Sequence, residues 1–132
     1  MGRRVSAKNT IAAIWFLRVR GAQVSELLIL AKLEEIRNIL ERHKVQFWPD
    51  FLAERARQLQ AAYSSGHKRA KQEALEELEM LYGGMGSFND LVISREGGHD
   101  IASRDVPKIN AKLNKLRSRL YQVIQEEKTR LE

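Results

Sequence analysis

The chain has 132 residues, of which 43% are hydrophobic and 30% charged, and its formal net charge is +6. This composition is that of a single folded domain with a real core, and it excludes an intrinsically disordered chain. Because the sequence contains no cysteine, disulfide scaffolds, thiolate metal sites and cysteine nucleophiles are excluded as well.

The positive charge is concentrated at the N-terminus. Residues 1–23 contain five basic and no acidic residues, whereas the remainder contains 18 basic and 17 acidic ones. The high isoelectric point is therefore a property of the tail and is poor evidence for a nucleic-acid-binding fold. We predict a basic N-terminal extension, residues 1–24, followed by a single helical domain, residues 25–132.

Within the extension, residues 11–17 form an apolar run that is too short to cross a membrane. Bases precede and follow the run, and no small-residue cleavage site follows it. Three alternatives remain open for this segment: a basic amphipathic helix on a membrane surface, an extra N-terminal helix packed on the body, or a tail outside the ordered domain.

Hydrophobic spacing predicts four main helices, at about residues 25–43, 49–64, 67–82 and 107–130. Ser25 is the expected N-cap of the first helix, and Leu28 is expected to widen its buried stripe. The predicted core is formed by Ile29, Leu33, Ile36 and Leu40, then Leu52, Ala56, Leu59 and Tyr63, then Leu75, Leu78, Leu81 and Tyr82, and finally Ile109, Leu113, Leu116, Leu120 and Leu131. With no strand pattern, these elements predict an all-α helical bundle.

Three glycines in four residues, Gly83, Gly84 and Gly86, follow the third helix. We interpret them as a structural turn in which Gly83 and Gly84 cap the helix; an anion-binding nest is the less favoured alternative. The following segment to residue 106 is predicted to be irregular. Its apolar stretch at residues 91–94 fits either a short extended segment or a single helical turn.

Polar residues after the glycines are the first candidate site. Ser87 can cap a turn, and Asn89 and Asp90 can tie down the loop backbone through their own side chains. A less favoured interpretation is a small hydrolase or transferase that uses Asp90 and His99, although no nucleophile or metal set accompanies them. No catalytic residue, metal or cofactor is predicted. The candidate partner-binding residues of this region are Ser87, Asn89, Asp90, Arg95, Glu96, His99 and Asp100.

The second candidate is a basic ridge on the last helix, formed by Lys108, Lys112, Lys115 and Arg119 at helical spacing. Arg117 adds a further base, and residues 106–125 contain no acid. Three alternatives remain open for the ridge. It is solvated or paired internally with the glutamates of the third helix, it binds an acidic protein, or it binds nucleic acid. Aromatic residues that would stack bases are not interleaved with it.

The run from Leu81 to Leu91, Leu-Tyr-Gly-Gly-Met-Gly-Ser-Phe-Asn-Asp-Leu, is followed by a Leu-x-x-x-Leu-Tyr pattern that ends at Tyr121. Over about residues 50–125 the chain resembles an uncharacterised family of small bacterial helical proteins with this motif. The residues that match it are Leu81, Gly83, Gly84, Gly86, Ser87, Asn89, Asp90 and Leu91. The resemblance implies an all-helical body, bacterial origin and cytoplasmic residence, and it supplies no activity.

These features favour a non-enzymatic protein-interaction module, of which immunity- and antitoxin-like proteins are the class-level analogy. The alternative is nucleic-acid binding through the basic tail together with the ridge. The oligomeric state is left open.

Overall fold

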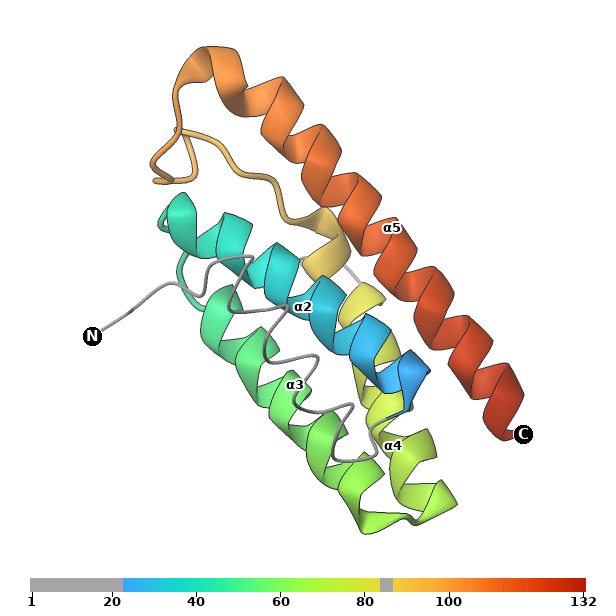
Figure 1. Ribbon diagram of the computed structural model, residues 1–132. Helices are drawn as coiled ribbons and strands as arrows, with labels where there is room; N and C mark the ends of the chain where they lie inside the picture. The colour runs from blue at the N-terminus through green and yellow to red at the C-terminus, as the bar shows by residue number, and fades with distance from the viewer. Residues whose placement is uncertain (1–22, 84–86) are drawn as a thin grey trace.

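The computed structural model describes residues 23–83 and 87–132 (Figure 1). The first 22 residues of the expected extension, together with Gly84 and Gly86, lie outside the described residues. The division into residues 1–24 and 25–132 therefore stays a prediction.

Four α-helices and three short 3₁₀ turns account for most of the described chain, and these two ranges contain no strand. The all-α bundle predicted from the sequence is confirmed. The elements are α2 (Val24–Arg42), α3 (Trp48–Ser65), α4 (Lys68–Glu79), η1 (Met80–Tyr82), η2 (Phe88–Asp90), η3 (Ser103–Asp105) and α5 (Val106–Leu131).

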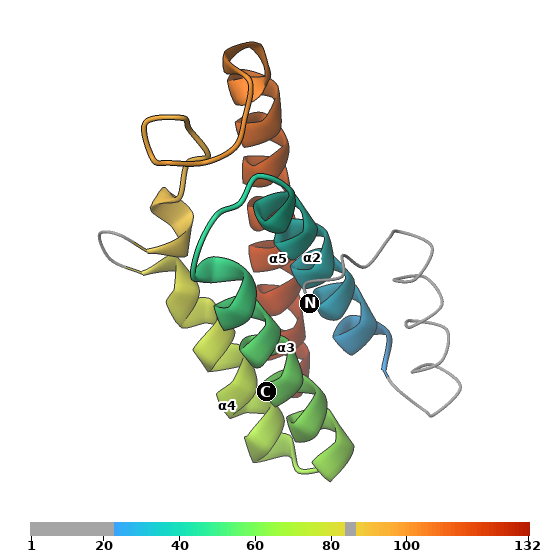
Figure 2. The same ribbon diagram turned by 90° about the vertical axis from the view of Figure 1, so that its left-hand side faces the viewer.

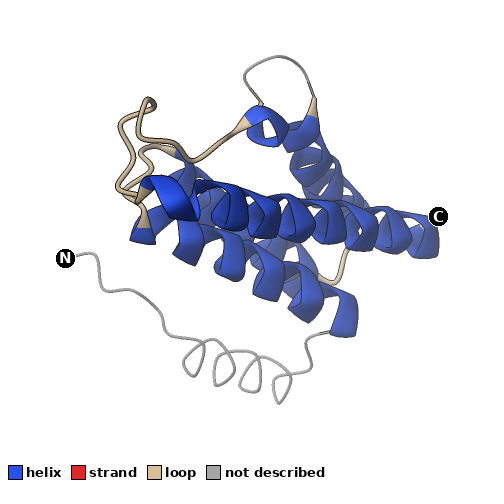
Figure 3. Ribbon diagram, turned by 90° about the horizontal axis from the view of Figure 1, so that it is seen from above, coloured by secondary structure: helices blue, strands red, loops and turns tan. Residues whose placement is uncertain are grey.

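The helices form a ring in which each contacts the next: α2 packs on α3, α3 on α4, α4 on α5, and α5 back on α2. The long helix α5 runs along one side of the molecule, and η1 and η2 connect the end of α4 to the flank of α5 (Figures 1 and 2). Seen from above, with the helices running across the view, most of the loops gather at one end of the bundle (Figure 3). This end carries the predicted loop residues.

The predicted apolar stripes meet in one core, and leucines or isoleucines from all four helices are fully buried there. The prediction that Leu28 widens the buried stripe is wrong, because this residue is 42% exposed. It shares its side of the helix with Lys32 and Glu35, four and seven residues further on, and that side faces solvent.

The predicted N-cap at Ser25 is also wrong. The helix begins at Val24, with Gln23 in the capping position and no side-chain cap. The Ser25 hydroxyl instead hydrogen-bonds the buried carboxylate of Glu127 on α5. A tertiary partner therefore takes the hydroxyl that the sequence pattern assigned to the helix end.

The expected glycine cap of the third helix takes a different form at Gly83. The helix tightens into η1, and Gly83 is extended, with φ −99°, rather than left-handed. Its N–H bonds the Met80 carbonyl at 3.3 Å. Since 3₁₀ bonds already satisfy the terminal carbonyls, no left-handed residue is needed there. By contrast, Gly66 ends α3 in the left-handed conformation, with φ +74°.

Candidate interaction surfaces

Ser87, the first described residue after the glycines, caps the following turn, as the sequence predicted. Ser87 precedes η2, and its hydroxyl accepts the Asn89 N–H at 3.3 Å. Asn89 and Asp90 are exposed, whereas Phe88 between them is fully buried. The 3₁₀ turn thus inserts one aromatic ring into the core and leaves its two polar side chains at the surface.

Arg117 fixes this turn to α5. Its Nη1 donates to the carbonyls of Phe88 at 2.6 Å and Leu91 at 2.8 Å, and Nη2 donates to the Asn114 side chain. Its guanidinium lies 5.7 Å from the centre of the Phe88 ring. Burial lowers the pKa of Arg117, which is only 4% exposed, and the nearby Asp90 and Tyr82 act in the opposite direction.

The sequence interpretation of Arg117 as a further base of the ridge is therefore wrong. About 100° separates successive residues of an α-helix, so Arg117 lies about 200° around α5 from Lys115. In the sequence, the position of Arg117 next to the predicted core residue Leu116 did not indicate that its side chain is buried. That role depends on carbonyls from a distant segment.

Asn110 holds the extended residues that follow. Its side-chain oxygen accepts the Ile93 N–H, and its side-chain nitrogen donates to the Ile93 carbonyl, both at 2.8 Å. The same nitrogen donates to the Val106 carbonyl at 2.8 Å. One asparagine therefore replaces the neighbouring strand that an isolated extended residue would otherwise need. The sequence offered no signal for this residue.

His99 acts on its own loop. Its Nδ1 accepts the Ser94 N–H at 3.0 Å, and its backbone N–H bonds the Ser94 carbonyl at 3.1 Å. The Ser94 hydroxyl accepts the Gly97 N–H at 3.0 Å. Because Nδ1 accepts, the proton of the neutral ring belongs on Nε2. Arg95 and Glu96 at the tip of the loop are exposed.

Asp100 joins this loop to the end of α2. Its N–H bonds the His43 carbonyl at 2.8 Å, and its own carbonyl lies 2.8 Å from His43 Nδ1, which must donate. The Asp100 carboxylate lies 4.0 Å from Lys44 Nζ, with both side chains largely exposed. The structure thus brings the loop that follows η2 against the turn between α2 and α3.

The basic ridge of Lys108, Lys112, Lys115 and Arg119 is exposed along its whole length. Within the described chain, no ion pair or hydrogen bond engages the three lysine side chains, and Arg119 donates to Gln122 on its own helix at 3.0 Å. The ridge therefore presents positive charge to solvent.

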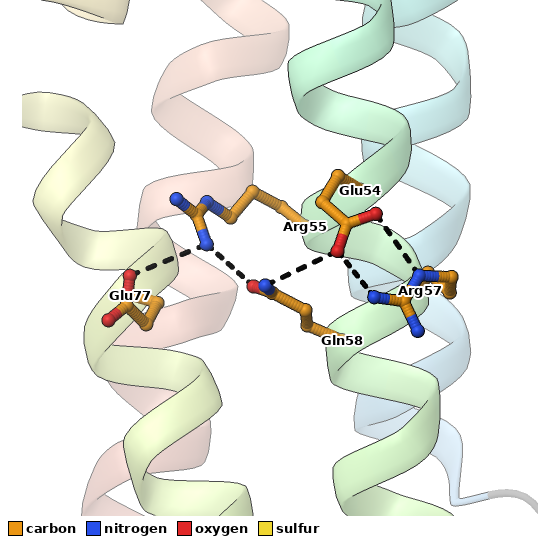
Figure 4. A network of polar contacts seen from close by, with 5 residues as sticks. All are labelled: Glu54, Arg55, Arg57, Gln58 and Glu77. Atoms are coloured by element: carbon orange, nitrogen blue, oxygen red, sulfur yellow. Dashed lines mark hydrogen bonds and ion pairs between the residues drawn. The ribbon is translucent and has the colours of Figure 1, made fainter.

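Within the described chain, the ion pairs formed by acids of α4 do not involve the ridge. Glu77 lies 3.4 Å from Arg55 of α3, in the network that also contains Glu54, Arg57 and Gln58 (Figure 4). Glu79 pairs with Lys128 at 2.7 Å, near the C-terminal end of α5. Pairing of the ridge with the third predicted helix, one of the alternatives left open by the sequence, is contradicted by these contacts.

The two predicted groups do not form one continuous surface around α5. Asn110, Asn114, Arg117 and Tyr121 define the flank that holds η2, and the ridge lies on the opposite flank by helical rotation. Tyr121 packs edge-on against Tyr82, whose hydroxyl donates to the Arg117 carbonyl at 2.7 Å. The ridge and the turn residues must therefore be considered separately.

A feature that the sequence did not reveal is the turn between α2 and α3. Trp48 N–H bonds the Gln46 carbonyl at 2.7 Å across Phe47, which has φ +70° and ψ −57°. This is the γ-turn with a left-handed central residue, a rare and strained geometry that costs about 1–3 kcal/mol. Lys44 also has a positive φ, of 57°. The sequence predicts only the helix start at Pro49, because nothing in it marks a phenylalanine for positive φ.

The ring of Phe47 is 63% exposed. It stacks on Phe51 at 5.2 Å, and it meets Trp48 edge-on at 5.3 Å. The Trp48 ring in turn lies 5.5 Å from buried Phe88. Ring packing therefore supports the strained turn from below, while the outer side of Phe47 is in solvent.

A buried polar cluster lies at the opposite end of the bundle. Glu127, 1% exposed, accepts hydrogen bonds from Tyr63 of α3 and from Arg130, whose Nε is 2.6 Å away. Burial raises the pKa of Glu127, but the hydrogen bonds from Arg130, Tyr63 and Ser25 outweigh it and hold that pKa below its usual value. For Glu26, also buried, desolvation dominates and raises the pKa, opposed by a backbone bond from Gln23 and by Lys71.

Among the described residues, no group of three or more histidine and acidic side chains is arranged to hold a metal ion. In the same part of the chain, no helix combines the length and apolarity required to cross a bilayer.

Residues 41–102 match the model of a family described as a domain of unknown function (DUF6966). Over these residues the match supports the expectation of an uncharacterised family. The DUF6966 match contains the γ-turn, α3, α4, η1, η2 and the His99 loop, and it ends before α5. No curated protein and no solved structure matches the chain.

Proposed function

We propose that this protein is a non-enzymatic interaction module that binds an acidic surface of another protein through the ridge of Lys108, Lys112, Lys115 and Arg119. The observation that carries the proposal is that the ridge lysines are exposed and form no ion pair within the described chain, while Glu77 and Glu79 of α4 pair with bases outside the ridge. Unpaired like charges repel one another, and an acidic partner relieves that repulsion.

The composition of the ridge favours a protein over single-stranded nucleic acid as the partner. Its four cations extend over about 17 Å of helix, since each residue advances about 1.5 Å. No aromatic ring is interleaved with them, and the one aromatic residue of α5, Tyr121, packs edge-on against Tyr82 away from the ridge. Single-stranded nucleic acids gain much of their affinity by stacking on such rings.

The finer parts of the proposal rest on analogy and on the family resemblance. A small, cysteine-free, single-domain protein with a charged helix face fits the class of immunity- or antitoxin-like proteins that neutralise another protein. We further propose a bacterial, cytoplasmic setting. The polar residues in and around η2 and its loop remain predicted partner contacts: Ser87, Asn89, Asp90, Arg95, Glu96, His99 and Asp100.

The test compares capture by three baits, each the full chain, from a host lysate after nuclease treatment. The Lys112→Glu/Lys115→Glu double variant reverses the ridge, and Lys68→Glu/Arg69→Glu reverses two exposed cations on α4 as a matched control. We expect one acidic protein, in stoichiometric amount, on the unchanged chain and on the α4 variant but not on the ridge variant. Capture that the ridge variant retains would contradict the proposal.

Nucleic acid provides the other outcome. If the ridge binds phosphates, nucleic acid is recovered at low salt without nuclease, and its recovery falls steeply as salt is raised. Removal of residues 1–22 should then weaken binding, whereas capture of an acidic protein through the ridge should survive that truncation.

A further inference from the structure

The loop that follows the extended residues is closed by one histidine ring. The Ser94 N–H donates to His99 Nδ1 at 3.0 Å, and the His99 N–H donates to the Ser94 carbonyl at 3.1 Å. Because a backbone N–H can only donate, His99 Nδ1 must be an unprotonated acceptor. The bond from Ser94 to the ring therefore exists only while the ring is neutral.

The loop is also packed closely around this ring. A side-chain carbon at Gly97 would lie 3.1 Å from His99 Cε1 and 3.1 Å from the Ser94 hydroxyl oxygen, which is tighter than an ordinary contact. The Gly97 N–H bonds that hydroxyl at 3.0 Å, and the Gly98 N–H bonds the Arg95 carbonyl at 3.0 Å. The position of the ring is thus fixed by packing as well as by its hydrogen bond.

Protonation reverses the role of His99 Nδ1. A charged imidazole carries a proton on both ring nitrogens, so two donors would face each other across the 3.0 Å between Ser94 N and Nδ1. Histidine is the side chain that ordinarily gains this proton between about pH 8 and pH 5. The Ser94 N–H then loses its acceptor, and the charged ring has to leave its place beside Gly97.

The other charges at this end of the bundle balance one another. Glu41, Arg42, His43 and Lys44 lie at the end of α2, Asp50 at the start of α3, Arg95, Glu96 and Asp100 in the loop itself, and Arg104, Asp105 and Lys108 at the start of α5 (Figure 1). Apart from the histidine, these are five bases and five acids. Histidine is the residue type among them that titrates between about pH 8 and pH 5.

His43, the second histidine at this end, makes a different kind of bond. Its Nδ1 donates to the Asp100 carbonyl at 2.8 Å, which the ring can do in both protonation states. The Asp100 N–H bonds the His43 carbonyl at 2.8 Å, and the ring takes no part in that bond. His43 Nε2, which would take the second proton, is buried without a hydrogen bond in the described chain, so this residue needs its own control.

We infer that His99 is a pH-sensitive switch: the neutral ring closes the loop from Ser94 to His99, and the protonated ring releases it while Asp100 stays bonded to the end of α2. Release frees Arg95 and Glu96, the exposed residues at the tip, from one fixed arrangement. The switch is independent of the ridge on α5 and of its partner. Both histidines lie within residues 41–102, the part of the chain that matches DUF6966.

Nuclear magnetic resonance of the full chain tests the switch, because it follows single amides and each of the three histidine rings. Between about pH 8 and pH 5, we expect the protection factor of the Ser94 amide to fall about tenfold. This factor is corrected for the pH dependence of intrinsic exchange, and its midpoint should coincide with that of the His99 ring. The Ile93 amide, bonded to Asn110, is the internal reference and should keep its protection.

Two substitutions of His99 reproduce the two states. His99→Asn places a neutral oxygen near the position of Nδ1, so Ser94 should stay protected over the whole pH range. His99→Phe removes the acceptor, so Ser94 should be unprotected over the whole range. The unchanged chain should resemble His99→Asn at the upper end and His99→Phe at the lower end. His43→Asn, whose amide can still donate to the Asp100 carbonyl, is the matched control and should leave the pH response unchanged.

Several results would overturn the inference. One is a Ser94 response to pH that persists in His99→Asn or disappears in His43→Asn, and another is full protection of Ser94 in His99→Phe or at the lower end in the unchanged chain. Circular dichroism shows whether each variant folds. If a variant does not fold, the midpoints in the unchanged chain still decide, because a Ser94 midpoint that differs from that of the His99 ring contradicts the switch.

Discussion

At the scale of single residues, the buried side chain of Arg117 holds two distant segments of the chain together. A buried guanidinium that bonds only carbonyls and an amide must recover its lost hydration from those bonds, and the bonds join α5 to η2 and Leu91. Arg119, two residues later, has the same chemistry and is exposed. Helical position alone gives these two arginines different roles.

Replacing Arg117 by methionine should lower the free energy of unfolding by about 2–3 kcal/mol, because two carbonyls lose a charged donor. Urea denaturation followed by circular dichroism measures the change. Arg119→Met is the control and should stay within about 0.5 kcal/mol of the unchanged chain. Equal effects of the two variants would show that Arg117 does not hold η2.

The contributions of the two buried glutamates to the free energy of unfolding should change in opposite directions with pH. The lowered pKa of Glu127 gives stability that is present above its ordinary value of 4.5 and is lost as pH falls through the folded-state pKa. The raised pKa of Glu26 has the reverse effect: its contribution is intact below 4.5 and is lost as pH rises through the folded-state pKa.

Glu127→Gln should therefore destabilise the protein at pH 7, by about 1.5–3 kcal/mol if the hydrogen bonds to its charge are lost, and have less effect near pH 4. Glu26→Gln should stabilise it at pH 7 and change little near pH 4. Thermal melts at the two pH values decide this. A loss of stability at pH 7 in both variants would be inconsistent with the opposite environments of the two carboxylates.

At the scale of elements, the segment from Phe88 to His99 has almost no regular structure. Hydrogen bonds from side chains to its backbone hold it in place. Arg117 bonds the carbonyls at its start, Asn110 bonds both backbone groups of Ile93, and Ser94 is bonded by His99. Because an unpaired buried backbone group is costly, these side chains take the place of a neighbouring strand. α5 is thus both a core helix and the scaffold of this segment.

Asn110→Ala should release that segment locally. The Ile93 amide loses its acceptor, so hydrogen exchange at Ile93 should accelerate by about tenfold or more, corresponding to a lost bond of about 1.4 kcal/mol. Amides in the middle of α3 serve as the internal reference and should exchange as before. Unchanged protection at Ile93 would mean that Asn110 does not order the extended residues.

The γ-turn is the element whose geometry departs furthest from local preference. Two residues other than glycine, Lys44 and Phe47, have positive φ within four positions. Val45 between them is buried, and its N–H bonds the Leu40 carbonyl at 2.9 Å. Packing of Val45 and Trp48 fixes both sides of the turn, and the residues beside them absorb the strain.

At the scale of the whole molecule, charge is distributed by face. Glu77 and Glu79 of α4 are matched by bases on α3 and α5, whereas the ridge on the first half of α5 has no such match in the described chain. Exposed ion pairs contribute little to stability, so the ridge can serve binding without cost to the fold.

Reversing the ridge should therefore leave folding intact. We expect Lys112→Glu/Lys115→Glu to change the free energy of unfolding by no more than about 0.5 kcal/mol, as for other exposed substitutions. Chemical denaturation at low and high salt tests this. A large loss of stability at low salt would reveal an internal partner for the ridge.

The sequence by itself determined the helices and the core. Apolar residues at spacings of three and four specify which side of each helix is buried, and a helix is closed by local bonds, so its pattern can be seen within one stretch of chain. The predicted ends lie within three residues of the observed ones. Ser87 as the cap of a turn after the glycines was also a correct expectation.

Only the tertiary structure decided what the polar residues do. Arg117, Asn110 and Ser25 have partners 17 to 102 positions away in the sequence, and Phe47 adopts a conformation that its own preferences oppose. A hydrogen bond or a strained turn of this kind exists only after packing has brought distant segments together. No local pattern encodes that arrangement, which is why the core was predictable and the flanks of α5 were not.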